Sequence, residues 1–259
     1  MNEDAGKGGV RSVQLALDVL EKVASAREEI GVSELAVQLG ITKGSVFRHL
    51  KTLVERGYLS QNPQTSKYRL GIQTYVLGQV AASGIDLLSA SADAIRDLRD
   101  ELGLSVVLSV LQGRRLMVVE TQLGKSTLEI GVRTGTELQL HCNAQGKVAL
   151  AFAKQLSVDQ LPGELPAITP NTVTDRVQLM REVSEVRAQG WAVAIEEETL
   201  GICAIAAPIM GVNAEFIGAV ALVATVQNIG PQVSLAQVQA LKKAALRASW
   251  NLGFKGELQ

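Results

Sequence analysis

The chain has 259 residues, of which 47% are hydrophobic and 20% are charged, and its formal net charge is −1. This length and composition fit a globular protein of two ordinary domains or one large domain, and they exclude a disordered chain. The near-neutral balance excludes a general affinity for nucleic acid, so a function of that kind must lie in a local patch.

The cysteines and the apolar runs narrow the class further. Cys142 and Cys203 form no CxxC pair, which argues against a disulfide scaffold or a zinc site and favours a reducing cytoplasm. Residues 1–10 are typical of a flexible tail rather than a signal peptide. The longest apolar run, residues 201–212, contains a proline and is too short to span a bilayer. We expect a cytoplasmic, nucleoid-associated protein without metal, cofactor or membrane segment.

Residues 11–71 have the element order of a winged helix-turn-helix. Periodic apolar residues predict a helix over residues 12–26, whose inward face should carry Val13, Leu17, Leu20 and Val23. Ser33 is expected to cap a short second helix that ends at Gly40. A third helix should begin near Thr42 or Lys43 and stop at Gly57. Two short strands around the turn at residues 62–66 complete the unit as a hairpin.

The rest of the chain predicts a linker helix over residues 72–85 and an α+β domain over residues 86–259. Strand patterns cover residues 104–112, 114–122, 190–197, 201–210 and 215–226. Helical patterns cover residues 85–103, a segment starting near Asn143, residues 175–189 and residues 234–252. Residues 161–171 read as a proline-rich loop. The three late strands are expected to form an antiparallel sheet.

Positive charge is concentrated between Thr42 and Leu70, where six basic side chains face one acid, Glu55. On a helical wheel, one face of the third helix carries hydrogen-bond donors and the other is apolar. The apolar face holds Val46, Leu50, Leu53 and Val54, with Phe47 at its edge. The DNA major groove admits one α-helix, and a guanidinium can hold a guanine edge through two hydrogen bonds. We therefore interpret this segment as a recognition helix with Arg48 as its base reader.

The other donors receive lesser roles in this interpretation. Expected base or phosphate contacts are Ser45, His49 and Thr52. Expected phosphate contacts are Lys43, Lys51, Arg56, Lys67 and Arg69. Thr42 should cap the helix, whose N-terminal NH groups also favour a phosphate. The alternative is an ordinary solvated face, but the turn, the hairpin and the charge bias together favour DNA binding.

Several other motifs carry no catalytic or metal chemistry. The "LGKST" run at residues 123–127 lacks the first glycine of a phosphate loop, because position 119 is valine. His141 and Cys142 lack an orienting third group, so nucleophilic catalysis is not expected. Cys203 reads as a small core residue, with redox sensing as an open alternative. The carboxylates at residues 196–198 alternate between the two faces of a strand and are expected to be solvated.

Two long motifs, in order, resemble the IclR family of bacterial transcriptional regulators. "HCNAQGKVALA" resembles the family pattern H-x-x-A-x-G-K-A-x-L-A. "GWAVAIEEETLGICAIAAPI" resembles G-Y-A-x-x-x-E-E-x-x-x-G-x-x-x-I-A-A-P-I. Upstream, "SVQLALDVLEKVA", "VSELAVQLGITKGSVFRHLKTLVERGYL" and "YRLG" are similar to the winged helix of this family. The resemblance extends over nearly the whole chain.

The resemblance implies a GAF-like effector-binding domain with a central antiparallel sheet, a homodimer or dimer of dimers, and a palindromic or repeated DNA operator. It also implies an effector pocket on the concave face of the sheet, within residues 138–145, 196–203 and 219–223. The residues carried over by motif are Leu138, Leu140, His141, Cys142, Ala144, Glu198, Cys203, Ala221 and Val223.

One departure from the family pattern bears on the effector. Members that bind small polar acids often carry S-x-S-G-P in the penultimate motif, whereas Ala221 and Val223 occupy the serine positions here. Burial of a charged ligand without such hydroxyls is costly, while an apolar ligand gains about 25 cal/mol per Å² buried. We therefore expect a hydrophobic, aromatic effector, as for the similar TtgV-like repressors of solvent- and drug-efflux pumps.

The sequence thus predicts a DNA-binding regulator that is not an enzyme, and that acts as a repressor released by its effector. An IclR-type repressor or activator of a catabolic operon responding to a small organic acid is the alternative. Two other classes remain open. An enzyme using the C-terminal domain is disfavoured by the missing catalytic residues, and a ligand-free architectural DNA binder is disfavoured by the large second domain.

Overall fold

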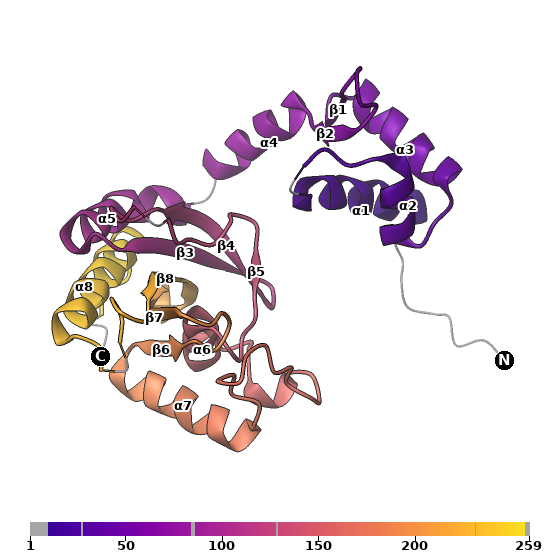
Figure 1. Ribbon diagram of the computed structural model, residues 1–259. Helices are drawn as coiled ribbons and strands as arrows, with labels where there is room; N and C mark the ends of the chain where they lie inside the picture. Colours follow the sequence, from indigo (N-terminus) through magenta and orange to yellow (C-terminus); the bar gives the residue numbers. More distant parts are fainter. Residues whose placement is uncertain (1–9, 27, 84–85, 128, 231, 257–259) are drawn as a thin grey trace. The chain divides into compact units, whose positions relative to one another are not determined.

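The computed structural model describes residues 10–26, 28–83, 86–127, 129–230 and 232–256 (Figure 1). Its contacts divide the chain after Gly84 into two compact units. The expected tail lies almost wholly outside the described residues. Each unit has a hydrophobic core of its own.

The first unit is a winged helix-turn-helix, as predicted. Its elements are α1 (Arg11–Ser25), α2 (Val32–Leu39), α3 (Lys43–Glu55), β1 (Leu59–Gln61), β2 (Tyr68–Leu70) and α4 (Ile72–Ser83). The strands β1 and β2 pair antiparallel, and Ile30 adds a bridge to Tyr68. Gly40 ends α2 with φ +64°, a conformation that glycine adopts without strain. This left-handed cap makes the sharp turn into α3.

Two local expectations for this unit are wrong. Ser33 does not cap α2, because the helix already begins at Val32. Its N-cap is Gly31, which has no side chain to make a capping hydrogen bond. The inward face of α1 is also displaced. Val13 and Leu17 are 54% and 51% exposed, whereas Val19 is fully buried. The helical period was recognised correctly, but the buried face of α1 is rotated toward Val19 and Val23, so Val13 and Leu17 lie outside it.

The second unit is a six-stranded antiparallel sheet with two helices on each face (Figure 1). The sheet order is β5-β4-β3-β8-β7-β6. Its strands are β3 (Ser105–Gln112), β4 (Arg115–Gln122), β5 (Glu137–Leu138), β6 (Ala192–Ile195), β7 (Ile202–Met210) and β8 (Phe216–Thr225). The helices are α5 (Asp86–Leu102), α6 (Ala144–Phe152), α7 (Arg176–Gln189) and α8 (Leu235–Asn251), with short 3₁₀ turns at Val158–Gln160 and Val212–Ala214. Every element except β5 and the 3₁₀ turns was expected from the sequence.

The two faces of this sheet bury separate cores. Alternate residues of β7 and β8, such as Ile205 and Leu222, pack with α5 and α8. The residues between them, such as Ala206 and Ala221, pack with α6 and α7. This alternation follows from the period of two along a strand. The face under α6 is rich in alanine, which lets the helix lie close to the sheet.

Glycine is required in β8 where two strands approach closely. A Cβ built on Gly218 would lie 2.0 Å from the backbone oxygen of Ser109 in β3. We expect Gly218→Ala to lower the free energy of unfolding by about 3 kcal/mol, the upper end for overpacking, because a central strand cannot move aside. Chemical denaturation checks this, with Gly163→Ala as the control because its built Cβ meets nothing within 4 Å. Equal stability of the two variants would contradict the close approach.

Candidate nucleic-acid interface and effector cavity

The N-terminus of α3 is fixed by a side-chain cap, as predicted. The hydroxyl of Thr42 accepts a hydrogen bond from the backbone NH of Ser45, at 3.3 Å. The described residues place no acid in the first turn, and Lys43 is exposed there. The free NH groups and the positive end of the helix dipole therefore meet solvent beside a lysine, an arrangement that favours an anion such as a phosphate.

The exposed face of α3 is basic but rotated relative to the expected one. Arg48, Lys51 and Thr52 are exposed, while Ser45 and His49 are only half-buried flank positions. Val46 and Leu50 are fully buried against α1 and α2. The exposed face of α3 is thus rotated by about a quarter turn about the helix axis from the predicted face, which was centred on Ser45. The rotation is toward Arg48 and Lys51. Lys43 and Arg56 are exposed near the two ends of the helix.

The hairpin presents the two predicted wing cations. Lys67 and Arg69 are exposed on either side of Tyr68, which is 3% exposed and anchors β2 in the core. The turn is held by Asn62, whose side-chain oxygen accepts backbone NH bonds and whose amide donates to Glu29 at 2.8 Å. The first unit therefore carries all ten predicted DNA-contact residues on α3, its two caps and the hairpin.

The second unit contains a cavity of about 360 Å³ at the N-terminus of α6. Its floor is a row of neighbouring residues, Ala194, Ala204 and Val223, paired across β6, β7 and β8. Ile202, Ala144 and a wall from residues 130–132 add to its apolar lining. Small side chains on the floor leave the volume that a larger residue would fill.

Several polar side chains also line this cavity. The carbonyl oxygen of the Asn143 side chain caps α6, and its amide donates to Glu198 at 2.6 Å. The Gln145 amide donates to the hydroxyl of Ser109 and the backbone oxygen of Ala219, so it is already occupied. Arg133 lines the cavity from an exposed position. Among the lining residues it is the side chain that can offer a positive charge to a ligand.

A buried ion network lies beside the cavity. Lys147 of α6 is 2% exposed and holds Glu197 at 2.6 Å and Glu182 at 2.7 Å. Burial raises the pKa of Glu197, although Lys147 acts in the opposite direction. Burial, with the nearby charges of Glu198 and Glu197, also raises the pKa of Cys142 to about 12. Its thiol is therefore neutral at neutral pH and is not activated for nucleophilic attack.

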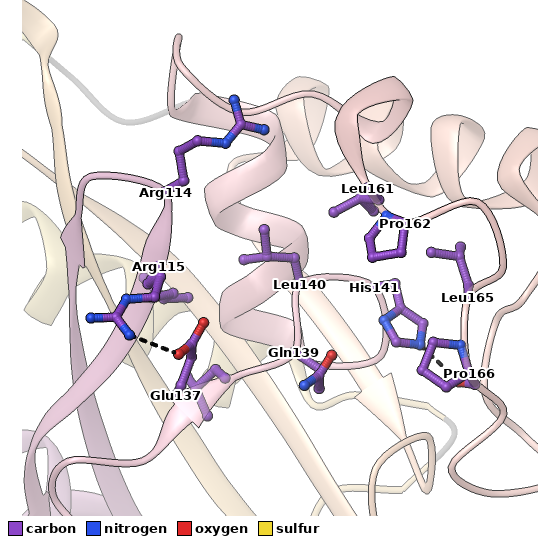
Figure 2. Close-up of a pocket in the computed structure, with 12 residues that line it drawn as sticks. Arg114, Arg115, Glu137, Gln139, Leu140, His141, Leu161, Pro162, Leu165 and Pro166 are labelled. Atoms are coloured by element: carbon purple, nitrogen blue, oxygen red, sulfur yellow. Dashed lines mark hydrogen bonds and ion pairs between the residues drawn. The ribbon is translucent and has the colours of Figure 1, made fainter. Parts of the chain in front are cut away.

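Seven of the nine predicted effector residues are divided between two cavities. Cys142, Ala144, Glu198 and Val223 line the cavity of about 360 Å³. Leu138, Leu140 and His141 line a smaller one of about 170 Å³, shown in Figure 2. There the His141 ring contacts the backbone oxygen of Pro166 through Nε2 at 3.0 Å, and Arg115 pairs with Glu137 at 3.5 Å. Leu138, Leu140 and His141 therefore lie outside the lining of the larger cavity.

Cys203 and Ala221 line neither cavity. Cys203 points to the opposite face of the sheet, into the core formed with α5 and α8, and its burial raises the pKa of its thiol. Ala221 lies in the core on the α6 side of the sheet, paired with Ala206 and fully buried. Both residues thus lie outside the lining of these two cavities, and their part in effector binding stays a prediction. The wall at residues 130–133, including Arg133, lies in an irregular segment that the sequence patterns did not single out.

Residues 79–250 match the family described as bacterial transcriptional regulator IclR C-terminal, and residues 12–63 match the IclR helix-turn-helix domain. The chain belongs to the IclR family of transcriptional regulators. It is 29% identical over 248 residues to the HTH-type transcriptional regulator XynR of Escherichia coli, covering 95% of this chain and 98% of the relative.

Two solved structures share the fold. The IclR transcriptional regulator of Alicyclobacillus acidocaldarius is 28% identical with a TM-score of 0.85, covering 95% of this chain and all of that one. An IclR homolog from Microbacterium hydrocarbonoxydans, solved with 4-hydroxybenzoate, is 21% identical with a TM-score of 0.82, covering 93% of this chain and 99% of that one.

The helices within the described part of this IclR chain include none with the length and hydropathy of a membrane-spanning segment.

Arg48 generates a prediction for DNA recognition. We expect Arg48→Ala to weaken specific operator binding by about 1–3 kcal/mol, roughly 5- to 150-fold, because a bidentate guanine contact is lost. Fluorescence anisotropy with operator and scrambled duplexes measures this. Lys154→Ala, an exposed cation in the second unit, is the control. An unchanged preference between the two duplexes would refute base reading by Arg48.

Glu197 generates a prediction for pH. Its folded pKa is raised, so its relative contribution to stability is fully present at pH below about 4.3 and is lost as pH rises toward the folded value. The stability of wild type relative to Glu197→Gln should therefore fall as pH rises above about 4.3. Urea unfolding from about pH 4 to about pH 8 measures the difference. Glu164→Gln, at an exposed carboxyl group, is the control substitution. Parallel pH profiles of wild type and Glu197→Gln would contradict the assignment.

Proposed function

We propose that this IclR-family regulator is a repressor that leaves its operator when a small aromatic molecule occupies the cavity at the N-terminus of α6. The observation that carries the proposal is the pairing of a basic, capped α3 in one unit with a cavity of about 360 Å³ in the other. Each part matches one requirement of an effector-controlled DNA binder. The protein is then a binding protein rather than an enzyme.

The DNA contacts follow from the exposed face of α3 and the hairpin. In this proposal Arg48 reads a base edge in the major groove, with Thr52 beside it. Phosphate contacts come from Lys43, Lys51, Arg56, Lys67 and Arg69. The half-burial of Ser45 and His49 supports only flank contacts for these two. A homodimer or dimer of dimers would place two such units on a repeated operator, because half-site spacing must match the oligomer.

The effector class follows from the cavity lining. The floor of Ala194, Ala204 and Val223 favours an apolar ring, and a cavity of this size suits a small molecule. The polar lining offers Asn143, already bonded to Glu198, and the exposed Arg133. A ring with one anionic or hydroxyl group would match both the apolar and the polar lining residues. The homolog solved with 4-hydroxybenzoate supports this class through its shared fold.

Two target classes correspond to two effector classes. A purely hydrophobic effector supports control of an efflux pump, since such a pump removes apolar compounds. The second candidate is a catabolic operon that responds to an organic acid, and the position of Arg133 favours it. In either case effector and operator binding oppose each other by a coupling of about 1–3 kcal/mol, which is a 5- to 150-fold change in affinity.

A gel-shift titration on the DNA upstream of the gene tests the proposal. We expect an aromatic acid or a neutral aromatic compound to reduce operator binding roughly 5- to 150-fold. Ala204→Phe should abolish this response by filling the cavity floor, while DNA binding without effector is retained. Ala236→Phe, exposed on α8, is the matched control.

Arg133→Met separates the two effector classes. Loss of the response to an aromatic acid, with the response to its neutral analogue retained, would identify an acid effector. An equal response in wild type and in Ala204→Phe would contradict effector binding in this cavity.

A further inference from the structure

Phe47 is an apolar side chain on the basic face of α3. It is 52% exposed, while its neighbour Val46 and the next inward residue Leu50 are fully buried. It is absent from the apolar cluster of the first unit, which does include Leu53 and Val54 at partial burial. Phe47 therefore does not complete the core, although the helical wheel placed it at the edge of the apolar face.

Exposure alone would mean little, because single exposed apolar residues are common on protein surfaces. The surroundings of Phe47 are more specific. Gly44 lies one turn before it, and Lys51 lies one turn after it on the same side of α3. Arg48 is adjacent, and both basic side chains are exposed. A Cβ built on Gly44 meets nothing within 4 Å, so the surface in front of this turn is open.

This pattern matches the chemistry of one DNA base. In the major groove, the 5-methyl group of thymine is an apolar contact point, and phenylalanine is among the side chains that contact it. The N-terminal residues of a recognition helix are those that reach base edges, and Phe47 is the fifth residue of α3. The absence of a side chain at Gly44 would let the groove approach this turn closely.

We propose that Phe47 is a specificity-determining residue that contacts the 5-methyl group of a thymine next to the base pair read by Arg48. The inference rests on the proposed entry of α3 into the major groove and adds a base preference to it. The basic residues hold the duplex, and Phe47 selects thymine by burying its methyl group. Cytosine and uracil, which lack this methyl group, are disfavoured at the same position.

Selection from random duplexes with the full-length wild-type protein supplies the DNA for the test. Each thymine of the selected consensus is then replaced singly by deoxyuridine, which removes only the methyl group. We expect one position in each half-site to lose about 4-fold in affinity, the effect of one buried methyl group. In Phe47→Ala the same replacement should have no effect, and selection should no longer favour thymine there.

Val37→Ala is the control, because Val37 is 83% exposed on α2. It should keep the wild-type sensitivity to deoxyuridine. The wild-type arm needs no substitution, so the inference stays testable even if Phe47→Ala is unstable. Two outcomes would overturn the role of Phe47 while leaving DNA binding by α3 intact. One is a consensus in which deoxyuridine is tolerated at every position. The other is a loss of affinity on deoxyuridine replacement that is equally large in a folded Phe47→Ala variant. Failure of wild type to select any consensus would instead overturn sequence-specific binding by α3.

Discussion

The buried ammonium group of Lys147 ties α7 and the segment after β6 to α6, the helix whose N-terminus borders the cavity of about 360 Å³. A lysine at 2% exposure is unstable unless it is paired, and its two carboxylate partners come from α7 and from the segment after β6. The backbone oxygen of one partner, Glu197, in turn accepts bonds from the hydroxyls of Thr169 and Thr172. One charge on α6 thereby fixes α7, the proline-rich loop and the strand that leads to Glu198.

The cavity and this network are adjacent in the chain and in space. Glu198, which lines the cavity and accepts from Asn143, directly follows Glu197. Asn143 also caps the helix that carries Lys147. A ligand that displaces the bond between Asn143 and Glu198 therefore acts on the first turn of α6 and on the segment paired with Lys147 together. The cavity is thereby connected, through hydrogen bonds and ion pairs, to α6 and α7 of the same unit.

The sequence predicted the elements well and the faces less well, for a physical reason. The capping of α3 by Thr42 and the stop at Gly40 are local, so they could be read from a few neighbouring residues. Which side of α3 is buried depends on how closely α1 and α2 pack, and a helical wheel contains no such information. The sequence also cannot show which face of the sheet Cys203 of β7 occupies, because this strand has apolar residues on both faces. The motif placed Cys203 in the effector pocket, whereas it lies in the core with α5 and α8. Arg133 lies in an irregular segment, where no period exists to position it.

The alanine-rich face of the sheet connects these observations to ligand choice. Ala192, Ala206 and Ala221 form one row across β6, β7 and β8, and α6 packs close above this part of the sheet. The neighbouring row of Ala194, Ala204 and Val223 extends past the start of α6, so its small side chains leave space instead of contacting a helix. The cavity is thus the part of one alanine-rich surface that α6 does not cover. Its floor is apolar because the same strands must pack against a helix one row away, and the charged and polar side chains of its lining include Arg133 and the Asn143–Glu198 pair.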